Sequence, residues 1–231
     1  MYIVTGVSRG LGKSIVQLLL DQGEAVLGIG RSHQFDHSNF TFLKCDLSDI
    51  KAIKNLVFPE FTGEVTLINN AGILGNVKRI SDQESIDLSE VLKVNTVAPM
   101  ELTHKVYNLL TRKDNFRLVN ISSGAGNRAI PSWAAYCASK AALNMLTETF
   151  FLEEKEKGNH IVAYAVSPGV IDTDMQGQIR NVDPTDFSAI ENFIGFKENN
   201  ELFTSIDAGK RLLKLLKMPF NQEIKVDLRT L

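Results

Sequence analysis

Short apolar runs alternate with longer amphipathic stretches along the chain. The runs are rich in Val and Ile and lack a regular alternation with polar residues, which predicts strands that are buried on both faces. They span Tyr2–Thr5, Ala25–Gly30, Thr41–Lys44, Val65–Asn69, Arg117–Ile121, Ile161–Val166 and Ile224–Asp227. Elsewhere apolar positions recur at three- and four-residue steps and predict helices over Leu11–Gln22, Ile50–Val57, Leu88–Leu110, Trp133–Glu156 and Ile206–Leu216. This order predicts an α/β fold in which a mainly parallel, seven-stranded sheet is doubly wound into three layers.

One segment interrupts the alternation. Between Asp172 and Thr204 the chain carries polar residues, Pro184 and scattered apolar positions. A long segment of this kind, late in an α/β chain, is typical of a functional lid, and the alternative is a pair of surface helices that packs on the core. We therefore expect one domain over the 231 residues, with a substrate lid at about 172–204.

Composition and charge narrow the possible function. Hydrophobic residues make up 44% and charged residues 23%, as in ordinary globular proteins. The 25 basic and 27 acidic residues are spread along the whole chain and give a formal net charge of -2. This balance argues against nucleic-acid binding and against a polybasic membrane surface. We expect small-molecule partners.

The two cysteines and the apolar runs bear on location. Cys45 and Cys137 follow no metal-binding spacing, which indicates reduced thiols and no metal site. Met1 leads directly into the first predicted strand, without the pattern of a signal peptide. No apolar stretch approaches the roughly 20 residues that a membrane crossing needs. We expect a cytoplasmic protein without a membrane segment.

A glycine-rich turn lies between the first predicted strand and the first predicted helix. It reads TGVSRGLG from Thr5 to Gly12, so the glycines follow a TGxxxGxG spacing. Backbone N–H groups of such a turn, together with the N-terminus of the helix, bind a pyrophosphate. The spacing is weak alone, but the strand before it and the helix after it favour a dinucleotide site over a plain tight turn. The expected contacts are Gly6, Ser8, Arg9, Gly10, Leu11 and Gly12.

The end of the second predicted strand bears on which dinucleotide is used. The chain there reads GIGRS from Gly28 to Ser32 and offers no carboxylate for the ribose 2′-OH of NAD. Arg31, together with Arg9, is suited to a 2′-phosphate through charge-assisted hydrogen bonds. This predicts NADPH/NADP⁺ as the cofactor, unless Arg31 is an ordinary solvated loop arginine.

A tyrosine and a lysine share one face of the helix predicted from Trp133. Tyr136 and Lys140 are four residues apart, which places them one helical turn apart. A free tyrosine has a pKa near ~10, and a neighbouring ammonium stabilises the phenolate and lowers that pKa. The pair is a candidate acid–base catalyst, although the YxxxK spacing alone is frequent on helix surfaces.

Further motifs follow in a fixed order along the chain. Asn69-Asn70-Ala71-Gly72 follows the fourth predicted strand, Asn95 lies in the next long helix, and Ser122-Ser123 ends the fifth strand. With these motifs the chain resembles the short-chain dehydrogenase/reductase family from Met1 to about Thr173. The resemblance implies an NAD(P)-binding Rossmann fold.

The resemblance also implies catalytic roles. Tyr136 would protonate the substrate carbonyl oxygen as hydride arrives from the nicotinamide. Ser123, which lies thirteen residues before the tyrosine as the family requires, would hold that oxygen by a hydrogen bond. Lys140 would also bind the nicotinamide ribose, and Asn95 would bind a water that links Lys140 to solvent. Further cofactor contacts are implied at Asp46, Leu47, Asn70, Ala71, Gly72, Pro168, Gly169, Val170 and Thr173.

Two stretches are similar to sepiapterin reductases and benzil-type reductases within the family. They are WAAYCASKAA from Trp133 and PGVIDTDMQ from Pro168. The similarity implies substrate contacts at Ser123, Tyr136, Trp133, Met175 and Asp227, the last as a substrate-anchoring carboxylate. The alternatives are core positions for Trp133 and Met175, and for Asp227 an ion pair with Arg229 or a turn cap.

The function expected from these features is an NADPH-dependent reductase of α-dicarbonyl compounds of the benzil or sepiapterin type. The same catalytic residues would serve a 3-oxoacyl-thioester reductase or a hydroxysteroid-type dehydrogenase. A non-catalytic NADP-sensing protein is a third possibility, but such a protein would be expected to lose Tyr136 or Lys140. Family members commonly pair their two long helices, which implies a homodimer or homotetramer through Leu88–Leu110 and Trp133–Glu156.

Overall fold

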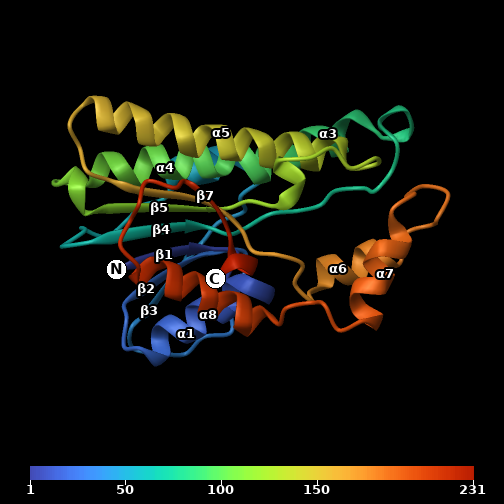
Figure 1. Cartoon of the computed structure of the whole chain (residues 1–231). Coiled ribbons are helices and arrows are strands. Elements are labelled where there is room, and N and C mark those ends of the chain that lie inside the picture. Colours follow the sequence, from blue (N-terminus) through green and yellow to red (C-terminus); the bar gives the residue numbers. More distant parts are fainter.

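The computed structural model describes residues 1–231 and contains one seven-stranded sheet (Figure 1). The strands lie in the order β3-β2-β1-β4-β5-β6-β7, and every neighbouring pair is parallel. They are β1 (Tyr2–Thr5), β2 (Val26–Gly30), β3 (Phe40–Lys44), β4 (Val65–Asn69), β5 (Phe116–Ile121), β6 (Val162–Ser167) and β7 (Lys225–Asp227). The sequence therefore predicted each strand to within one residue at either end, and the doubly wound fold is confirmed.

Helices cover both faces of the sheet (Figure 1). One face carries α1 (Gly10–Asp21) and α8 (Ser205–Lys217), which pack on a core that includes Val4, Ile15 and Leu212. The other face carries α2 (Ile50–Asn55), α4 (Ala98–Leu109) and α5 (Ala134–Glu156), with α3 (Ser85–Leu92) beside α5. A second core lies there, around Leu67 and Leu102. Two cores on opposite faces give the predicted three layers. No helix has the length and apolar content that a membrane crossing requires.

The long helix predicted over Leu88–Leu110 is interrupted. A π-helical turn, η2 (Lys93–Val97), separates α3 from α4, and Pro99 follows in the first turn of α4. Pro99 has no N–H to donate to the carbonyl oxygen of Asn95, four residues earlier. The backbone carbonyl oxygen of Asn95 therefore lacks the N–H donor that it would have in a regular α-helix. Helical interruptions of this π type occur frequently at functional sites.

The segment 172–204 contains two helices, as the alternative drawn from the sequence has it, although the sequence pattern gave no bounds for them. They are α6 (Asp174–Arg180) and α7 (Ile190–Glu198), which stand beyond the carboxyl ends of the strands, at the right of Figure 1. Phe187, Ile179 and Ile190 form a third apolar cluster with Trp133 and Tyr136 of the α5 region. The segment is thus a helix pair that packs on the protein, and its action as a lid stays a prediction.

Strand order reverses between β1 and β4, because β2 and β3 lie to one side of β1 while β4 to β7 lie to the other. In doubly wound sheets the ligand crevice opens at the carboxyl ends of the strands beside such a reversal. The glycine turn after β1 and the Asn69–Gly72 turn after β4 both lie at this point.

Candidate active site

A cavity of about 1620 Å³ lies at the carboxyl ends of the strands. Its walls come from the glycine turn, the turns after β2 to β6, the start of α5, the segment 172–204 and the end of β7. Of all the residues predicted for the site, only Gly12 and Asn95 do not line this cavity. The fold therefore brings together residues from both ends of the chain, such as Ser8 and Asp227.

The glycine turn is shaped by close packing. Gly6 has a φ of +71°, and a Cβ there would lie 2.9 Å from the Cα of Ala71. A Cβ on Gly12 would lie 2.2 Å from the carbonyl oxygen of Gly6. Gly12 thus lets α1 pack against the turn and does not line the cavity itself, and its predicted contact with the cofactor stays a prediction.

The N-terminus of α1 is suited to an anion. Arg9 occupies the N-cap position without a side-chain cap hydrogen bond, and the first turn contains no acidic residue. The first N–H groups of a helix have no partner within it, so those that begin at Gly10 are available to a pyrophosphate.

The turn after β4 is fastened to the turn after β1. The Thr5 hydroxyl oxygen accepts hydrogen bonds from the backbone N–H of Asn70 at 2.9 Å and of Ala71 at 3.0 Å. The Asn70 side-chain amide donates to the carbonyl oxygen of Thr5 at 2.9 Å. These bonds hold both sides of the cofactor crevice at a fixed separation.

The residues predicted to select the cofactor lie at the rim of the cavity. Arg31 is exposed and lies close enough to Asp46 to lower its pKa, although hydrogen bonds from Ser48 lower that pKa more. Arg9 forms an ion pair with Asp174 of α6 at 2.9 Å, with both side chains largely exposed. Arg9 is thus engaged by the segment 172–204, whereas Arg31 makes no ion pair.

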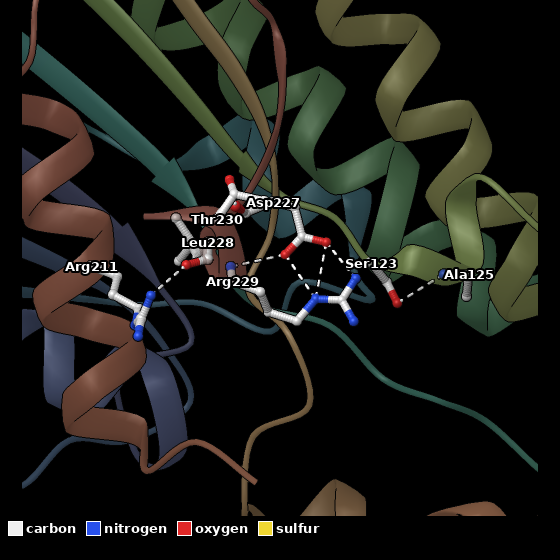
Figure 2. Close-up of polar contacts among 7 residues, drawn as sticks. All are labelled: Ser123, Ala125, Arg211, Asp227, Leu228, Arg229 and Thr230. Carbon is white, nitrogen blue, oxygen red and sulfur yellow. Dashed lines mark hydrogen bonds and ion pairs between the residues drawn. The ribbon is translucent and has the colours of Figure 1, made fainter. Parts of the chain in front are cut away.

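Tyr136, Lys140 and Ser123 meet in one wall of the cavity. Tyr136 and Lys140 are both buried, and the Lys140 nitrogen lies 5.8 Å from the centre of the Tyr136 ring. The same nitrogen donates to the carbonyl oxygen of Ile121 at 2.7 Å, which fixes it at the end of β5. The Ser123 hydroxyl oxygen accepts the backbone N–H of Ala125 at 3.2 Å, as Figure 2 shows.

Burial controls the protonation of this group. It raises the pKa of the Tyr136 phenol, and the Ser123 hydroxyl opposes this only in part. Burial also lowers the pKa of the Lys140 ammonium to about 8. Burial thus sets the direction of the Tyr136 pKa in the protein alone, and the lowering expected from Lys140 stays a prediction for the reacting complex. At neutral pH the phenol is neutral and able to donate a proton.

The Asn95 side chain is used in the frame of the site. Its oxygen accepts the backbone N–H of Ile73 and its nitrogen donates to the carbonyl oxygen of Ile73, both at 2.8 Å. The nitrogen also donates to the Ser139 hydroxyl at 3.0 Å, and Ser139 donates to the carbonyl oxygen of Tyr136 at 2.8 Å. Both hydrogens of the side-chain amide are thus engaged, and the backbone carbonyl of Asn95, which lacks an ordinary helical donor at Pro99, is a candidate for the predicted water. The sequence analysis missed Ser139, whose position three residues after the tyrosine gave no signal of its own.

The substrate side of the cavity is aromatic. The Trp133 ring stacks on Phe187 with centres 5.4 Å apart and planes 11° apart, and lies edge-on to Tyr136 at 5.5 Å. Met175 of α6 packs against the same cluster. Both predicted wall residues line the cavity and also belong to the apolar cluster, so the two readings of these residues are compatible.

Asp227 lines the cavity and is paired with Arg229. The Arg229 side chain donates to both carboxylate oxygens, at 2.5 to 3.0 Å (Figure 2). This is the second of the two alternatives drawn from the sequence. Hydrogen bonds from Arg229 hold the pKa of the Asp227 carboxyl below its usual range, so the group is ionised at neutral pH. Arg229 also lines the cavity, and the sequence analysis considered it only as a partner for Asp227.

Comparison with known proteins places the chain in a family. The family model of short chain dehydrogenases matches residues 1–183. A benzil reductase of Bacillus cereus that forms (S)-benzoin is 34% identical over 244 residues, with 97% of this chain and 98% of the relative covered.

Two solved structures are also similar. A short-chain dehydrogenase/reductase of Saccharomyces cerevisiae has a TM-score of 0.84 at 32% identity, over 98% of this chain and 95% of that one. A carbonyl reductase from chicken fatty liver, solved with NADPH bound, has a TM-score of 0.75 at 25% identity, over 99% and 96% of the two chains. The chain therefore belongs to the short-chain dehydrogenase/reductase family, and it is an oxidoreductase of carbonyl or alcohol groups that uses a nicotinamide cofactor.

Proposed function

We propose that the protein is an NADPH-dependent reductase of α-dicarbonyl compounds, of the benzil or sepiapterin type, with Tyr136 as the proton donor. The observation that carries the proposal is the buried, neutral phenol of Tyr136, set beside Lys140 and Ser123 in the cavity that the glycine turn also lines. The similarity to benzil reductase over nearly the whole chain supports this substrate class.

In this proposal the reduced nicotinamide supplies the hydride, and the residues of the chain handle the proton and the oxygen. The Ser123 hydroxyl donates a hydrogen bond to the substrate carbonyl oxygen, and the Tyr136 phenol gives that oxygen its proton. The resulting phenolate is stabilised by the Lys140 ammonium, whose position is fixed by the carbonyl oxygen of Ile121. The backbone carbonyl of Asn95 holds the water through which the proton is replaced.

The apolar walls favour a flat, aromatic substrate. Trp133 and Met175 face the cavity beside Tyr136, and a pocket of this kind binds by apolar contact with a few oriented polar groups. A screen of NADPH oxidation with benzil, sepiapterin, a 3-oxoacyl thioester and a 3-ketosteroid tests the assignment. The highest kcat/KM is expected for benzil or sepiapterin. Preference for the thioester or the steroid would contradict it, and NADPH binding without turnover of any compound would indicate a sensor.

The preference for NADPH rests on Arg31, which is exposed at the rim and faces no competing ion pair. An aspartate there would repel a 2′-phosphate and accept a hydrogen bond from a 2′-OH. We expect Arg31→Asp to shift the ratio of kcat/KM from NADPH towards NADH. A wild-type protein that already uses both cofactors equally would refute the argument.

The assembly and location belong to the same proposal. Met100 and Leu109 of α4, with Met145 and Leu152 of α5, are exposed apolar residues on the two long helices. We infer that these helices pair in a homodimer or homotetramer, which light scattering over a range of concentrations tests; a monomer throughout would refute it. The two free cysteines are in keeping with the reducing cytoplasm.

A further inference from the structure

The Asp227 carboxylate is already saturated within the chain. Its Oδ1 accepts the backbone N–H of Arg229 at 2.9 Å and the Arg229 Nε at 3.0 Å. Its Oδ2 accepts the same Nε at 3.0 Å and Nη2 at 2.5 Å. Both oxygens thus have charged donors, so a substrate N–H would have to displace part of a bidentate ion pair to reach this carboxylate.

Arg229, by contrast, keeps free donors. The guanidinium is a planar fork of five N–H groups, and Asp227 uses only its Nε–Nη2 edge. Nη1 makes no hydrogen bond, and the side chain is 61% exposed. In Figure 2 the guanidinium projects away from the backbone of η5 (Leu228–Thr230), and the Nη1 side of the fork points away from Asp227.

The structure holds this fork in place. The Arg211 guanidinium donates to the carbonyl oxygen of Leu228 at 3.0 Å, and the Thr230 hydroxyl donates to the carbonyl oxygen of Asp227 at 2.8 Å (Figure 2). The Arg229 stem passes close to Gly169, where a Cβ would lie 3.2 Å from the Arg229 Cγ. Gly169, Arg229 and Ser123 all line the cavity. The guanidinium is therefore an oriented donor group in the wall of the proposed active site.

We propose that Arg229, oriented by Asp227, is the polar anchor of the substrate and binds an acceptor oxygen, most strongly a carboxylate, carried by the substrate in addition to its reacting carbonyl. The proposal rests on the proposed carbonyl reductase function and extends its substrate class from dicarbonyls to keto acids. It departs from the expectation drawn from the sequence, in which the Asp227 carboxylate itself anchors the substrate. The Nη1–Nη2 edge matches the two oxygens of a carboxylate, whereas a single carbonyl oxygen uses it only in part.

Benzoylformate and its methyl ester are the matched test substrates, because they share the reacting ketone and the phenyl ring and differ in charge. We expect Arg229→Gln to lower kcat/KM for benzoylformate about 10- to 100-fold, as the loss of a charge-assisted hydrogen bond does. The ester and benzil lose a hydrogen bond from the guanidinium to an uncharged oxygen but no ion pair, so the ratio of acid to ester should fall about tenfold. Arg229→Lys, which keeps the charge and loses the fork, should lie between the wild type and Arg229→Gln.

Arg128→Gln is the control for charge alone. Arg128 is an exposed arginine that lines the same cavity and makes no ion pair. Its loss should change the ratio of acid to ester by less than about fivefold. If both Arg128→Gln and Arg229→Gln lower the ratio of acid to ester equally, the overall positive charge around the cavity explains the preference for the acid. That result would overturn the anchoring role of Arg229.

Asp227→Asn tests whether Asp227 positions Arg229 or itself binds the substrate. If Asp227 positions Arg229, this variant raises KM for benzoylformate with little change in kcat. If Asp227 itself anchors the substrate, the variant instead lowers kcat/KM for sepiapterin and spares benzoylformate, which would overturn the proposal.

A binding measurement distinguishes failure of this proposal from failure of the proposed function. Benzoylformate, added to the wild-type protein with NADP⁺, should raise the midpoint of thermal unfolding, and the shift should be lost in Arg229→Gln. Turnover of benzil without any effect of Arg229→Gln on the acid-to-ester ratio would overturn the anchor alone. Absence of turnover with every ketone would refute the reductase function, and the thermal shift would still decide whether Arg229 binds the acid.

Discussion

Phe187→Ala is expected to open the segment 172–204 while leaving the sheet intact. The Phe187 side chain is fully buried and stacks on Trp133, with Phe193 also in contact. A buried phenylalanine removes about 150–250 Å² from water, which is worth about 4–6 kcal/mol at ~25 cal/mol per Å². Measured Phe to Ala substitutions in cores cost about 3–5 kcal/mol.

The loss should fall on the segment because Phe187 belongs to the third apolar cluster and to neither of the two sheet cores. A change of about 3 kcal/mol shifts the equilibrium between closed and open forms of the segment by about 100-fold. We therefore expect the rates of proteolytic cleavage within 172–204 and of amide hydrogen exchange in α7 to rise by about 100-fold. The increase is smaller if the segment becomes mostly open, because the rates then reach those of the open form. KM for the carbonyl substrate should rise, because the open form lacks part of the aromatic wall.

Phe61→Ala is the matched control, since Phe61 is buried in the core below α2 and α4, away from the segment. That variant should lower the midpoint of global unfolding without selective cleavage at 172–204. If Phe187→Ala lowers global stability as Phe61→Ala does and leaves cleavage within 172–204 unchanged, the segment unfolds together with the core. The interpretation of the segment as a lid would then be wrong.

Three further outcomes follow from the site and the helices around it. Tyr136→Phe keeps the ring and removes the proton donor, so turnover should fall by orders of magnitude while NADPH binding, measured by fluorescence titration, is retained; near-normal turnover would refute the mechanism. The Lys140 pKa is about 8 and the Tyr136 pKa is raised, so Lys140 loses its charge first as the pH rises. We therefore expect kcat/KM for reduction to fall above about pH 8, and a flat profile up to pH 10 would contradict this assignment. Glu154 is buried and accepts hydrogen bonds from Tyr107, Asn159 and Lys157. Burial raises the pKa of its carboxyl, but these hydrogen bonds together lower it further, so the net shift is downward. Glu154→Gln should therefore lower the free energy of unfolding, measured in urea at pH 7, by about 1–3 kcal/mol. Because the folded-state pKa of Glu154 lies below the unfolded value, this contribution is present above about pH 4.5 and is lost as the pH falls through the folded-state pKa, so the variant should match the wild type more closely in acid.

The sequence was sufficient for the parts of the protein that depend on local pattern. Val- and Ile-rich runs separated by amphipathic helices permit few arrangements other than a parallel sheet covered on both faces, and the strands were predicted to within one residue. The glycine turn and the pair Tyr136 and Lys140 were found because their chemistry requires fixed spacings within one turn or one helix. Topology then brings such motifs together, since the carboxyl ends of parallel strands meet at one edge.

Only the tertiary structure decided the features that depend on contacts between distant segments. The helices α6 and α7 lie against Trp133, and this packing could not be read from a segment without a clear period. The direction of the Tyr136 pKa follows from burial that several elements create together, which the spacing of Tyr136 and Lys140 along the helix does not specify. The sequence left two roles open for Asp227, a substrate anchor or an ion pair with Arg229. The turn after β7 brings the Arg229 guanidinium onto the carboxylate, and both groups line the cavity. Spacing along a chain specifies which residues share a face, whereas burial and the choice of partner depend on how the whole chain packs.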